Sequence, residues 1–599
     1  MYIKCYSNQL NENLHQIYLW DDDEGYSTFK WEDKLGFDGM YPYQKFLIEK
    51  YGSNTNISSN HQIMYFDIET EMIDFKGEGK KDKEKEFRKR KLLSIVYYHQ
   101  NKDEWYCLIV DEENKLGDYE IEGKRIIKFK NQKSLLKSFI NKINEIGVDI
   151  LIGWNSDSFD IPFIYVKTKQ LLGKEWVDKL SPIGLTFESY KMNEKVYTEY
   201  PIRIYGIESL DFLRIHKKIV SKVEESYKLG KIGEKYIGKT KIEYEGNLYD
   251  LYMNDIKKFT DYNFMDVELL VDLNDNRNYL PLVINFCHRG KVNYSDYFNG
   301  GRIIDGSITT EMIETYGLNS IPNLNKQLDL EDVIGGFIYL KDKGWMEYGM
   351  DNDFVSMYPT IIITLNIGID TFRYRIKTDS FKWYGKFDDE VNMFLSLKEL
   401  KKMNQNQTIV IEDKLQKLHS IKVCDLINDI ETNNLSISSN GVCFSNDKIS
   451  SQSLVLKKWK KERLGYKNQM KVFFENGDLE KGKEYQIKQQ TLKILMNSIY
   501  GLNSLPTFRW GNSIIQNSIT MSGRRMITEY SNYINKQLNQ IGNQIEVELK
   551  QNGYSIRYNN QTENIIDIKP YKLEEGIKGK LFNKDEIKRK LFKWEKETI

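Results

Sequence analysis

The sequence predicts a multidomain protein that combines α/β and α+β domains. Its 599 residues are more than a single hydrophobic core supports. Between about residues 61 and 285, apolar strands such as "IMYFDIET" alternate with amphipathic helices such as "SLLKSFINKINEI", and this alternation is typical of such domains. After residue 350 the chain changes character, with a polar insertion at about 371–445 and then two helices with basic faces.

Composition limits the class of protein further. Hydrophobic residues make up 40% of the chain and charged residues 29%, which is typical of a soluble globular protein. Lys plus Arg and Asp plus Glu both number 87, so a nucleic-acid surface would require local charge separation. The five cysteines are scattered without a C-x-x-C pair, which disfavours a disulfide framework or zinc site and favours a reducing cytoplasm. We find neither an apolar run of ~18 residues nor a signal-peptide stretch, so we expect no membrane span.

Residues 76–91, "KGEGKKDKEKEFRKRK", form a run of charges between two expected strands. Such a run is usually solvated, and we interpret it as a hairpin tip or loop. The run is flanked by "HQIMYFDIET" and "LLSIVYY", which both have the apolar character of strands.

Three acidic motifs lie in this region. On the strand "IMYFDIET" the period of two places Asp67 and Glu69 on one face. Adjacent carboxylates that lose hydration repel one another, and a divalent cation such as Mg²⁺ or Mn²⁺ compensates for this directly. Taken alone, the D-x-E pair also fits an exposed strand end.

The second motif, "LIGWNSDSFDIPFI", places Asp160 where a buried strand turns back inward, with Asn155 able to position a neighbouring group. Alone, Asp160 also fits a helix N-cap. In the third motif, "FTDYNFMDVELL", Tyr262 and Asp266 are i and i+4 on a helix and share a face. Alone, this pair also fits a core tyrosine beside a surface aspartate.

In this order the three motifs resemble those of 3′→5′ exonucleases that use four carboxylates and a tyrosine. The resemblance implies an RNase H-like fold, with Asp67, Glu69, Asp160 and Asp266 as metal ligands and Tyr262 beside them. Four carboxylates hold two Mg²⁺ or Mn²⁺ ions, which act on the attacking water and the leaving 3′ oxygen of a phosphoryl displacement.

A second group of motifs begins at "DFVSMYPTIII", where Asp353 opens an expected apolar strand. This stretch resembles motif A of family B DNA polymerases, D-x-x-S-L-Y-P-S-I, with Met357 and Thr360 as mild departures. The resemblance implies that Asp353 holds the metals of the polymerase site and that Tyr358 excludes the ribose 2′-hydroxyl. A flat ring against C2′ leaves no volume for that oxygen, which is the group that separates RNA from DNA.

The segment "KILMNSIYG" matches motif B of the same family, K-x-x-x-N-S-x-Y-G, at every fixed position. On a helix Lys493, Asn497 and Tyr500 form one stripe, and Gly501 allows a backbone to approach closely. Lys493 is suited to the triphosphate, Asn497 to the space under the nucleotide and Tyr500 to the nascent base pair.

Two further segments resemble family motifs. Arg463 and Lys467 are i and i+4 on the helix "LVLKKWKKERLGYKNQM" and match the R-x-x-x-K pair that binds the triphosphate. A merely solvated basic helix is the alternative. The segment "VIGG" with Gly335 and Gly336 resembles the Y-x-G-G/A segment that follows the template strand, although the tyrosine is absent here.

The resemblance covers roughly residues 1–545 and implies the following domain order: an N-terminal domain at 1–60 completed by about 286–350, an exonuclease domain at 61–285, a ferredoxin-like palm in two parts at 351–445 and 503–599, and short two-helix fingers at 446–502. Implied partners are primer-template DNA, dNTPs and a sliding clamp. If the chain is viral, the implied location is the host cell cytoplasm.

The motif C string of the family, Y-G-D-T-D-S, does not occur in this sequence. At the expected place, "GYSIRYNNQTENIIDIKPYK" has a strand-turn-strand pattern with Asn559, Asn560 and Gln561 in the turn and Glu563 and Asp567 out of register. An amide oxygen is a poor Mg²⁺ ligand because it has no charge. We therefore expect a second polypeptide to supply motif C and the thumb. The alternative is a working exonuclease whose palm binds DNA without polymerising it.

Overall fold

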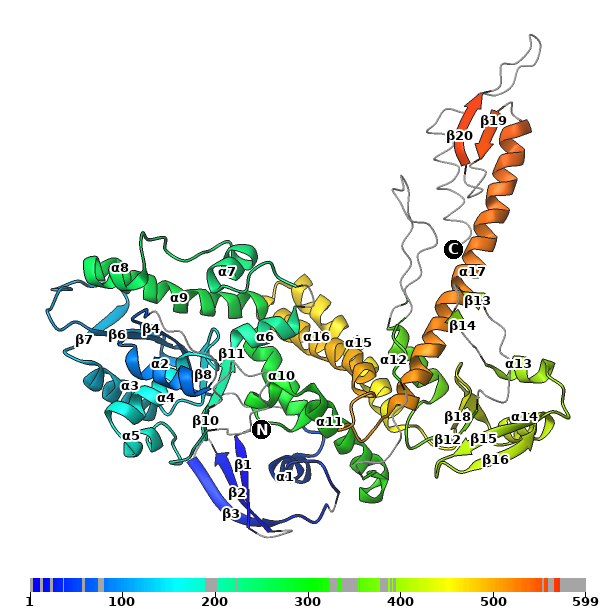
Figure 1. Cartoon of the computed structure of the whole chain (residues 1–599), viewed down its shortest axis with the longest axis horizontal. Coiled ribbons are helices and arrows are strands. Elements are labelled where there is room, and N and C mark those ends of the chain that lie inside the picture. The colour runs from blue at the N-terminus through cyan, green and yellow to red at the C-terminus, as the bar shows by residue number, and fades with distance from the viewer. Residues whose placement is uncertain are drawn as a thin grey trace. The chain divides into compact units, whose positions relative to one another are not determined.

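The structure is a computed structural model, drawn in Figure 1. It describes residues 4–10, 14–21, 25–35, 37–55, 60–73, 80–188, 202–220, 223–323, 332–336, 354, 356–377, 386–387, 390–391, 395–551, 554–558 and 565–570. The chain divides into two compact units. The first comprises residues 1–334, 350–382 and 395–519, and the second comprises residues 335–349, 383–394 and 520–599.

The first unit begins with a small antiparallel sheet of order β1-β2-β3 and one helix. The elements are β1 Cys5–Gln9, β2 Leu14–Asp21, β3 Gly25–Glu32 and α1 Pro42–Tyr51. The Cys5 N–H donates to Asn293 Oδ1 at 3.1 Å, and Asn293 Nδ2 donates to the Cys5 carbonyl at 2.9 Å. The first strand is therefore held by a residue that comes 288 positions later.

A six-stranded mixed sheet forms the centre of the next part, in the order β11-β8-β4-β5-β6-β7. Its strands are β4 Ile63–Thr70, β5 Leu92–His99, β6 Glu104–Val110, β7 Lys124–Phe129, β8 Ile150–Gly153 and β11 Glu208–Asp211. β4 runs parallel to β8 and antiparallel to β5. Every residue of β5 is buried, and its sequence is accordingly apolar except for Ser94 and His99.

Helices cover both faces of this sheet. The helices are α2 Lys80–Lys89, α3 Gln132–Ile146, α4 Asp160–Leu171, α5 Lys174–Asp178, α6 Phe212–Ile219, α7 Leu229–Ile237, α8 Leu248–Asn254 and α9 Ile256–Arg277. Phe66 and Ile68 of β4 share one core cluster with Phe139 of α3 and Phe163 of α4. On α9, Asn263 Nδ2 donates to Ser94 Oγ of β5 at 2.9 Å. Short elements complete this part: η1 Gln100–Lys102, β9 Thr186–Glu188 and β10 Ile202–Ile204.

Helices then lead from the six-stranded sheet to a second, five-stranded sheet. The elements before it are α10 Tyr279–Gly290, η2 Tyr294–Phe298, α11 Gly300–Tyr316, η3 Leu318–Ser320 and α12 Met357–Leu365. The sheet has the order β16-β15-β12-β18-β17. Its region comprises β12 Phe372–Ile376, α13 Leu397–Lys402, β15 Thr408–Asp413, β16 Leu418–Lys422, α14 Val423–Thr432, β17 Leu435–Ile437 and β18 Val442–Ser445.

Two long helices, α15 Ser451–Glu475 and α16 Leu479–Leu502, lie side by side in Figure 1. The turn between them contains Gly477, whose φ of 78° favours glycine. Near their base the buried Gln452 Nε2 donates to Asn503 Oδ1 at 2.6 Å and to the Trp510 carbonyl at 2.9 Å. The hairpin is therefore anchored at its base by buried polar contacts.

The second unit contains most of the helix α17 Ser513–Gln551 and two short hairpins. One hairpin is β13 Lys386–Phe387 with β14 Glu390–Val391, and the other is β19 Tyr554–Tyr558 with β20 Ile565–Pro570. In the latter, antiparallel pairing places Asp567 opposite Arg557. The strand-turn-strand pattern predicted after α17 is thus confirmed in its two strands.

The prediction of a mixed α/β and α+β multidomain chain is confirmed. The prediction of a loop for the charge run is wrong in part, because residues 80–89 form α2. Phe87, the single aromatic residue of the run, is buried and gives this helix a core contact. Around motif A the helix α12 begins at Met357, and Tyr358 and Pro359 lie in its first turn, where a proline is well tolerated.

Two further observations concern the described residues as a whole. Their five cysteines are all free. None of their helices combines the length and the apolar character that crossing a membrane requires.

Candidate functional site

Three carboxylates predicted from two distant motifs meet on one face of the six-stranded sheet. Asp67 and Glu69 project from β4 and Asp266 from α9, and one oxygen of each lies within 4.8 Å of the others. The period of two along β4 and the packing of α9 on that face bring them together. These are three of the four carboxylates that the sequence motifs predict as metal ligands.

Asp160 joins the same end of β4 from the other side. It is the first residue of α4, and its Oδ1 accepts a hydrogen bond from the Ile68 N–H at 3.2 Å. Ile68 lies between Asp67 and Glu69 in the chain, so this bond ties Asp160 to the cluster. Burial raises the pKa of Asp160 to about 7, although the bond from Ile68 lowers it in part.

The cluster is electrostatically costly without a cation. Burial raises the pKa of Asp67 well above its ordinary value, and the charges of Asp160, Glu69 and Asp266 raise it further. Burial, followed by the charge of Asp266, raises the pKa of Glu69 to about 8. The charges of neighbouring carboxylates therefore disfavour ionisation of Asp67 and Glu69, and a bound divalent cation relieves this condition.

Lys241, which sequence reasoning missed, contributes a positive charge to the cluster. Its Nζ lies 2.7 Å from Asp266 Oδ2 and donates to the Tyr262 hydroxyl at 3.0 Å. Burial, the largest single influence, lowers the pKa of Lys241, but Asp266, Tyr262 and Asp67 together outweigh it, and the pKa of the ammonium is raised. The segment "GKTKIEYEG" has no periodic pattern, so nothing in it distinguishes Lys241 from Lys239, which pairs with Asp272 at 2.6 Å.

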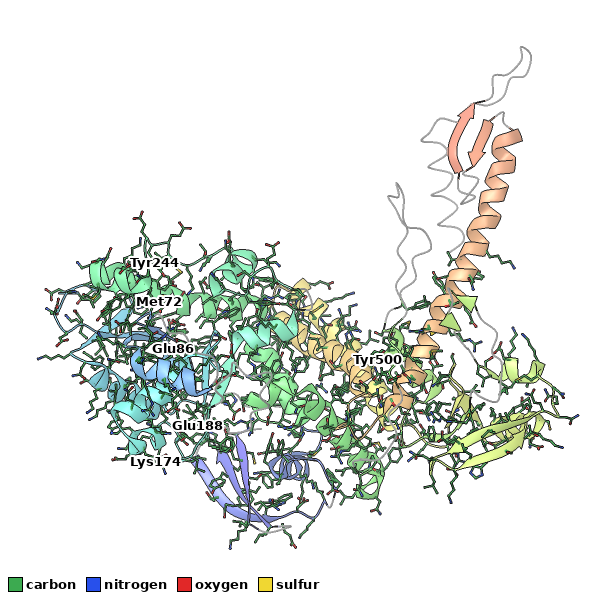
Figure 2. The ribbon with its side chains drawn as sticks, viewed as in Figure 1. Met72, Glu86, Lys174, Glu188, Tyr244 and Tyr500 are labelled. Carbon is green, nitrogen blue, oxygen red and sulfur yellow. The ribbon has the colours of Figure 1, made fainter. Side chains whose placement is uncertain are left out.

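Of the two other motif residues, Tyr262 is buried beside the cluster, whereas Asn155 is exposed. Tyr262 is buried one turn before Asp266 and packs edge-on against Tyr244, with ring centroids 5.3 Å apart; Figure 2 labels Tyr244. Asn155 is exposed with φ 63°, and its backbone N–H donates to Asp211 Oδ1 at 2.8 Å. Asn155 thus positions Asp211, and its side chain has no hydrogen bond within the cluster.

The donor set fits a divalent metal ion. Carboxylate oxygens are the hard ligands that Mg²⁺ and Mn²⁺ prefer. Among the described residues, Asp266 Oδ1 is buried and lacks a hydrogen-bond partner, and an unsatisfied buried oxygen is costly unless a ligand reaches it. Asp67, Glu69, Asp160 and Asp266 are therefore the residues that would hold the metal.

A second site is formed by residues of α12 and α16. The rings of Tyr358 and Tyr500 stack with centroids 4.1 Å apart and an interplanar angle of 19°. These tyrosines come from motifs A and B, separated by 142 positions in the sequence. On α16, Lys493, Asn497 and Gly501 are exposed on the same stripe as Tyr500.

Other predicted residues lie on α15 and near α17. Lys467 is exposed and Arg463 half-buried on α15, and Arg463 Nε is buried without a hydrogen-bond partner among the described residues. Gly335 and Gly336 are exposed, and the Gly335 carbonyl accepts from Arg524 Nη2 at 2.8 Å. Asp353, Asn559, Asn560, Gln561 and Glu563 lie outside the described residues.

Known proteins resemble both parts of the chain. The sequence profile of DNA polymerase family B matches residues 343–564, and that of the DNA polymerase family B exonuclease domain matches residues 44–232. The DNA-directed DNA polymerase of Escherichia phage RB69 is 27% identical over 277 residues, which is 45% of this chain and 30% of that protein. The DNA-directed DNA polymerase of Enterobacteria phage T4 is 26% identical over 257 residues, 43% of this chain and 28% of that protein.

Carboxylate clusters that suit divalent ions are found in enzymes that transfer phosphoryl groups, such as phosphatases, polymerases and nucleases. The chain belongs to DNA polymerase family B, since two profiles of that family match it in the order of the motifs. The matched segments span less than a third of the length of the two phage relatives.

The raised pKa values predict how metal-free stability depends on pH. Because Glu69 ionises near 8 and Asp160 near 7 instead of near 4, their burial favours folding at low pH. This stability is lost as pH rises through about 7–8, and a bound divalent ion should reverse the trend. We expect Glu69→Gln to raise the melting temperature in EDTA at pH 8.5 by roughly 2–4 °C, the effect of about 1 kcal/mol in a domain of this size.

Thermal melts of the unaltered chain and of Glu69→Gln at pH 5.5 and 8.5, each with EDTA or Mn²⁺, test this expectation. The exposed Glu175→Gln on α5 is the matched control and should not shift the melting temperature. An equal effect of Glu69→Gln at both pH values would contradict the expectation.

Proposed function

We propose that this chain is part of a DNA-directed DNA polymerase and carries a 3′→5′ proofreading exonuclease that acts on primer-template DNA. The observation that carries the proposal is the acidic cluster of Asp67, Glu69 and Asp266, with Asp160 bonded to the same strand. It lies in the part of the chain that matches the family's exonuclease domain. The polymerase activity is supported by the match of residues 343–564.

The finer architecture belongs to this proposal. The mixed sheet with helices on both faces supports an RNase H-like domain at residues 61–285. The α15–α16 hairpin supports short fingers at residues 446–502. We assign the palm, with a ferredoxin-like sheet, to residues 351–445 and 503–599, and the N-terminal domain to residues 1–60 completed by about 286–350.

In the exonuclease site the four carboxylates would hold two Mg²⁺ or Mn²⁺ ions. When bound, these ions would activate the attacking water and stabilise the leaving 3′ oxygen. Lys241 offsets part of the burial cost of the Asp266 carboxylate and so favours its ionised form. Tyr262 places its hydroxyl beside Lys241, where it is able to hold a water or a phosphate oxygen.

The purified chain should degrade single-stranded DNA from its 3′ end when Mg²⁺ or Mn²⁺ is present. Asp67→Ala with Glu69→Ala should lower the rate by about 10³-fold or more, because the metal site loses two charged ligands. The double variant Glu175→Ala with Asp178→Ala removes the same number of carboxylates from α5 and should keep full activity. Release of labelled nucleotides is the measurement, and full activity in the first variant would place the site elsewhere.

In the polymerase site Asp353 would hold the metals, and Tyr358 would pack against the sugar of the incoming dNTP. Stacking on Tyr500 supports this role, because it fixes the plane of the Tyr358 ring. Arg463, Lys467 and Lys493 would bind the triphosphate. Asn497 and Gly501, with Gly335 and Gly336 toward the template, would contact the nucleotide and DNA.

Tyr358→Ala, in a polymerase reconstituted from this chain, should admit ribonucleotides. Loss of the ring opens the volume that the 2′-hydroxyl requires, so the preference for dNTP over rNTP should fall by roughly 10–200-fold. Tyr358→Phe keeps the ring and should keep the preference. Single-nucleotide incorporation with matched dNTP and rNTP measures this ratio, and an unchanged ratio in Tyr358→Ala would refute the assignment.

Besides Asp353, the family's palm carries the acidic pair of motif C, Y-G-D-T-D-S, and this string does not occur in the sequence. We propose that a second polypeptide supplies it and that a sliding clamp is a further partner. The alternative function is a 3′→5′ exonuclease with a non-polymerising palm. It is favoured by the amide residues Asn559, Asn560 and Gln561 in the turn where the pair is expected.

Primer extension discriminates between these functions. With the exonuclease disabled by Asp67→Ala and Glu69→Ala, this chain alone should extend a primer barely, because one carboxylate cannot hold two dications. Addition of a polypeptide that carries the acidic pair should restore extension, and Asp353→Asn should remove it again. Robust synthesis by the lone chain would mean that another residue, such as Glu563 or Asp567, completes the site.

A further inference from the structure

The charge run between β4 and β5 folds as α2, which packs beside α4 (Figure 1). Phe87 is buried and contacts Phe159 and Phe163 edge-on, with ring centroids 5.6 and 5.5 Å apart. Phe159 directly precedes Asp160 in the chain. Phe87, which anchors α2, therefore contacts the residue that directly precedes Asp160 of the acidic cluster.

The connection that contains α2 leaves and rejoins the sheet at the end of β4 that carries Asp67 and Glu69. Thr70 pairs with Leu92 of β5, and the Glu71 N–H donates to the Lys91 carbonyl at 2.9 Å. Arg90 Nη1 lies 3.5 Å from Thr70 Oγ1. Figure 2 labels Met72, just beyond β4, and Glu86 on α2. The helix and the carboxylates thus lie at the same end of β4, with α2 on the α4 side of the sheet and the carboxylates on the α9 side.

The outer face of α2 is basic. Lys85, Arg88 and Lys89 are i, i+3 and i+4, and all three are exposed. Across residues 83–91, six cations outnumber two acids.

Both acids are engaged in ion pairs, one with a cation of this face and one with Arg90, which directly follows the helix. Glu84 pairs with Arg88 at 2.7 Å, and Glu86 pairs with Arg90 at 2.5 Å. The helix therefore presents a local positive surplus in a chain whose net charge is zero.

A nucleic-acid strand that ends in the acidic cluster meets an electrostatic difficulty. Its phosphates are repelled by the four carboxylates, and metal ions neutralise only the phosphate at the reacting end. The phosphates further along the strand need cations at the rim of the site. Among the described elements, α2 provides a surplus of cations on a helix anchored directly beside Asp160.

We propose that the exposed face of α2, with Lys85, Arg88 and Lys89, binds the phosphates of the single-stranded DNA whose 3′ end lies in the acidic cluster. This inference rests on the proposed exonuclease function. Binding is through charge and independent of base sequence, so it should weaken steeply as salt rises. Its effect should increase with strand length, because a dinucleotide is too short to reach beyond the cluster.

The test compares Lys85→Ala/Lys89→Ala with Lys174→Ala/Lys179→Ala in the full chain. The control pair lies on and directly after α5, which follows the far end of α4; Figure 2 labels Lys174. Binding of an oligonucleotide of about 20 nucleotides is measured by fluorescence anisotropy in EDTA, so that no cleavage occurs. The Lys85/Lys89 variant should bind about tenfold more weakly at low salt, and its log–log salt slope should be smaller by about 1.4.

Cleavage in Mn²⁺ provides a second readout. The ratio of kcat/KM for the oligonucleotide to that for a dinucleotide should fall about tenfold in Lys85→Ala/Lys89→Ala and further in Lys85→Glu/Lys89→Glu. Equal binding and an equal ratio in the α2 and α5 variants would overturn the proposal. So would tighter binding of a poly-glutamate peptide than of DNA, since α2 would then suit an acidic protein. If the unaltered chain cleaves neither substrate, the exonuclease assignment fails, while the binding experiment still decides whether α2 holds DNA.

Discussion

The repulsion among Asp67, Glu69, Asp160 and Asp266 is the constraint on which the first half of this protein depends. Four carboxylates are held at one end of β4, where burial raises the pKa values of Asp67, Glu69 and Asp160 well above the ordinary range and the charges of the other cluster carboxylates raise those of Asp67 and Glu69 further. Such an arrangement is unstable by itself. It persists because the surrounding sheet and helices have large apolar cores, with β5 buried along its whole length.

Lys241 compensates for only part of this repulsion. It pairs with Asp266 and contacts the Tyr262 hydroxyl, whereas the Asp160 oxygen that faces β4 accepts only from a backbone N–H. One cation beside four carboxylates leaves a negative surplus. The site is thus organised to bind positive charge, and its strain in the metal-free protein is the reason that a divalent ion should stabilise the fold.

Local periodicity explains which residues of the candidate sites the sequence could place on a shared face. The period of two placed Asp67 with Glu69, and the i, i+4 spacing placed Tyr262 with Asp266; both depend only on backbone geometry. Two other contacts depend on tertiary packing between distant segments: the pair of Lys241 with Asp266, and the hydrogen bond from the Asn155 N–H to Asp211. The stacking of Tyr358 on Tyr500 is an intermediate case, since the motifs identified both rings but not their contact. The prediction of a loop for the charge run was wrong in part because one buried residue, Phe87, packs a helix against α4.

The proposed function requires a chain of zero net charge to bind a polyanion. Equal totals of acidic and basic residues exclude a uniform field, so attraction and repulsion must be separated in space. Acidic residues from β4, α4 and α9 gather where the reacting phosphate would be, while the exposed face of α2 gathers cations at the rim. Bound metal ions would offset the negative charge of the acidic cluster, whereas the exposed face of α2 is positive without an ion. In the proposed function the two surfaces would therefore differ: the acidic cluster would require a cofactor to accept a phosphate, and α2 would attract the strand whether or not that cofactor is bound.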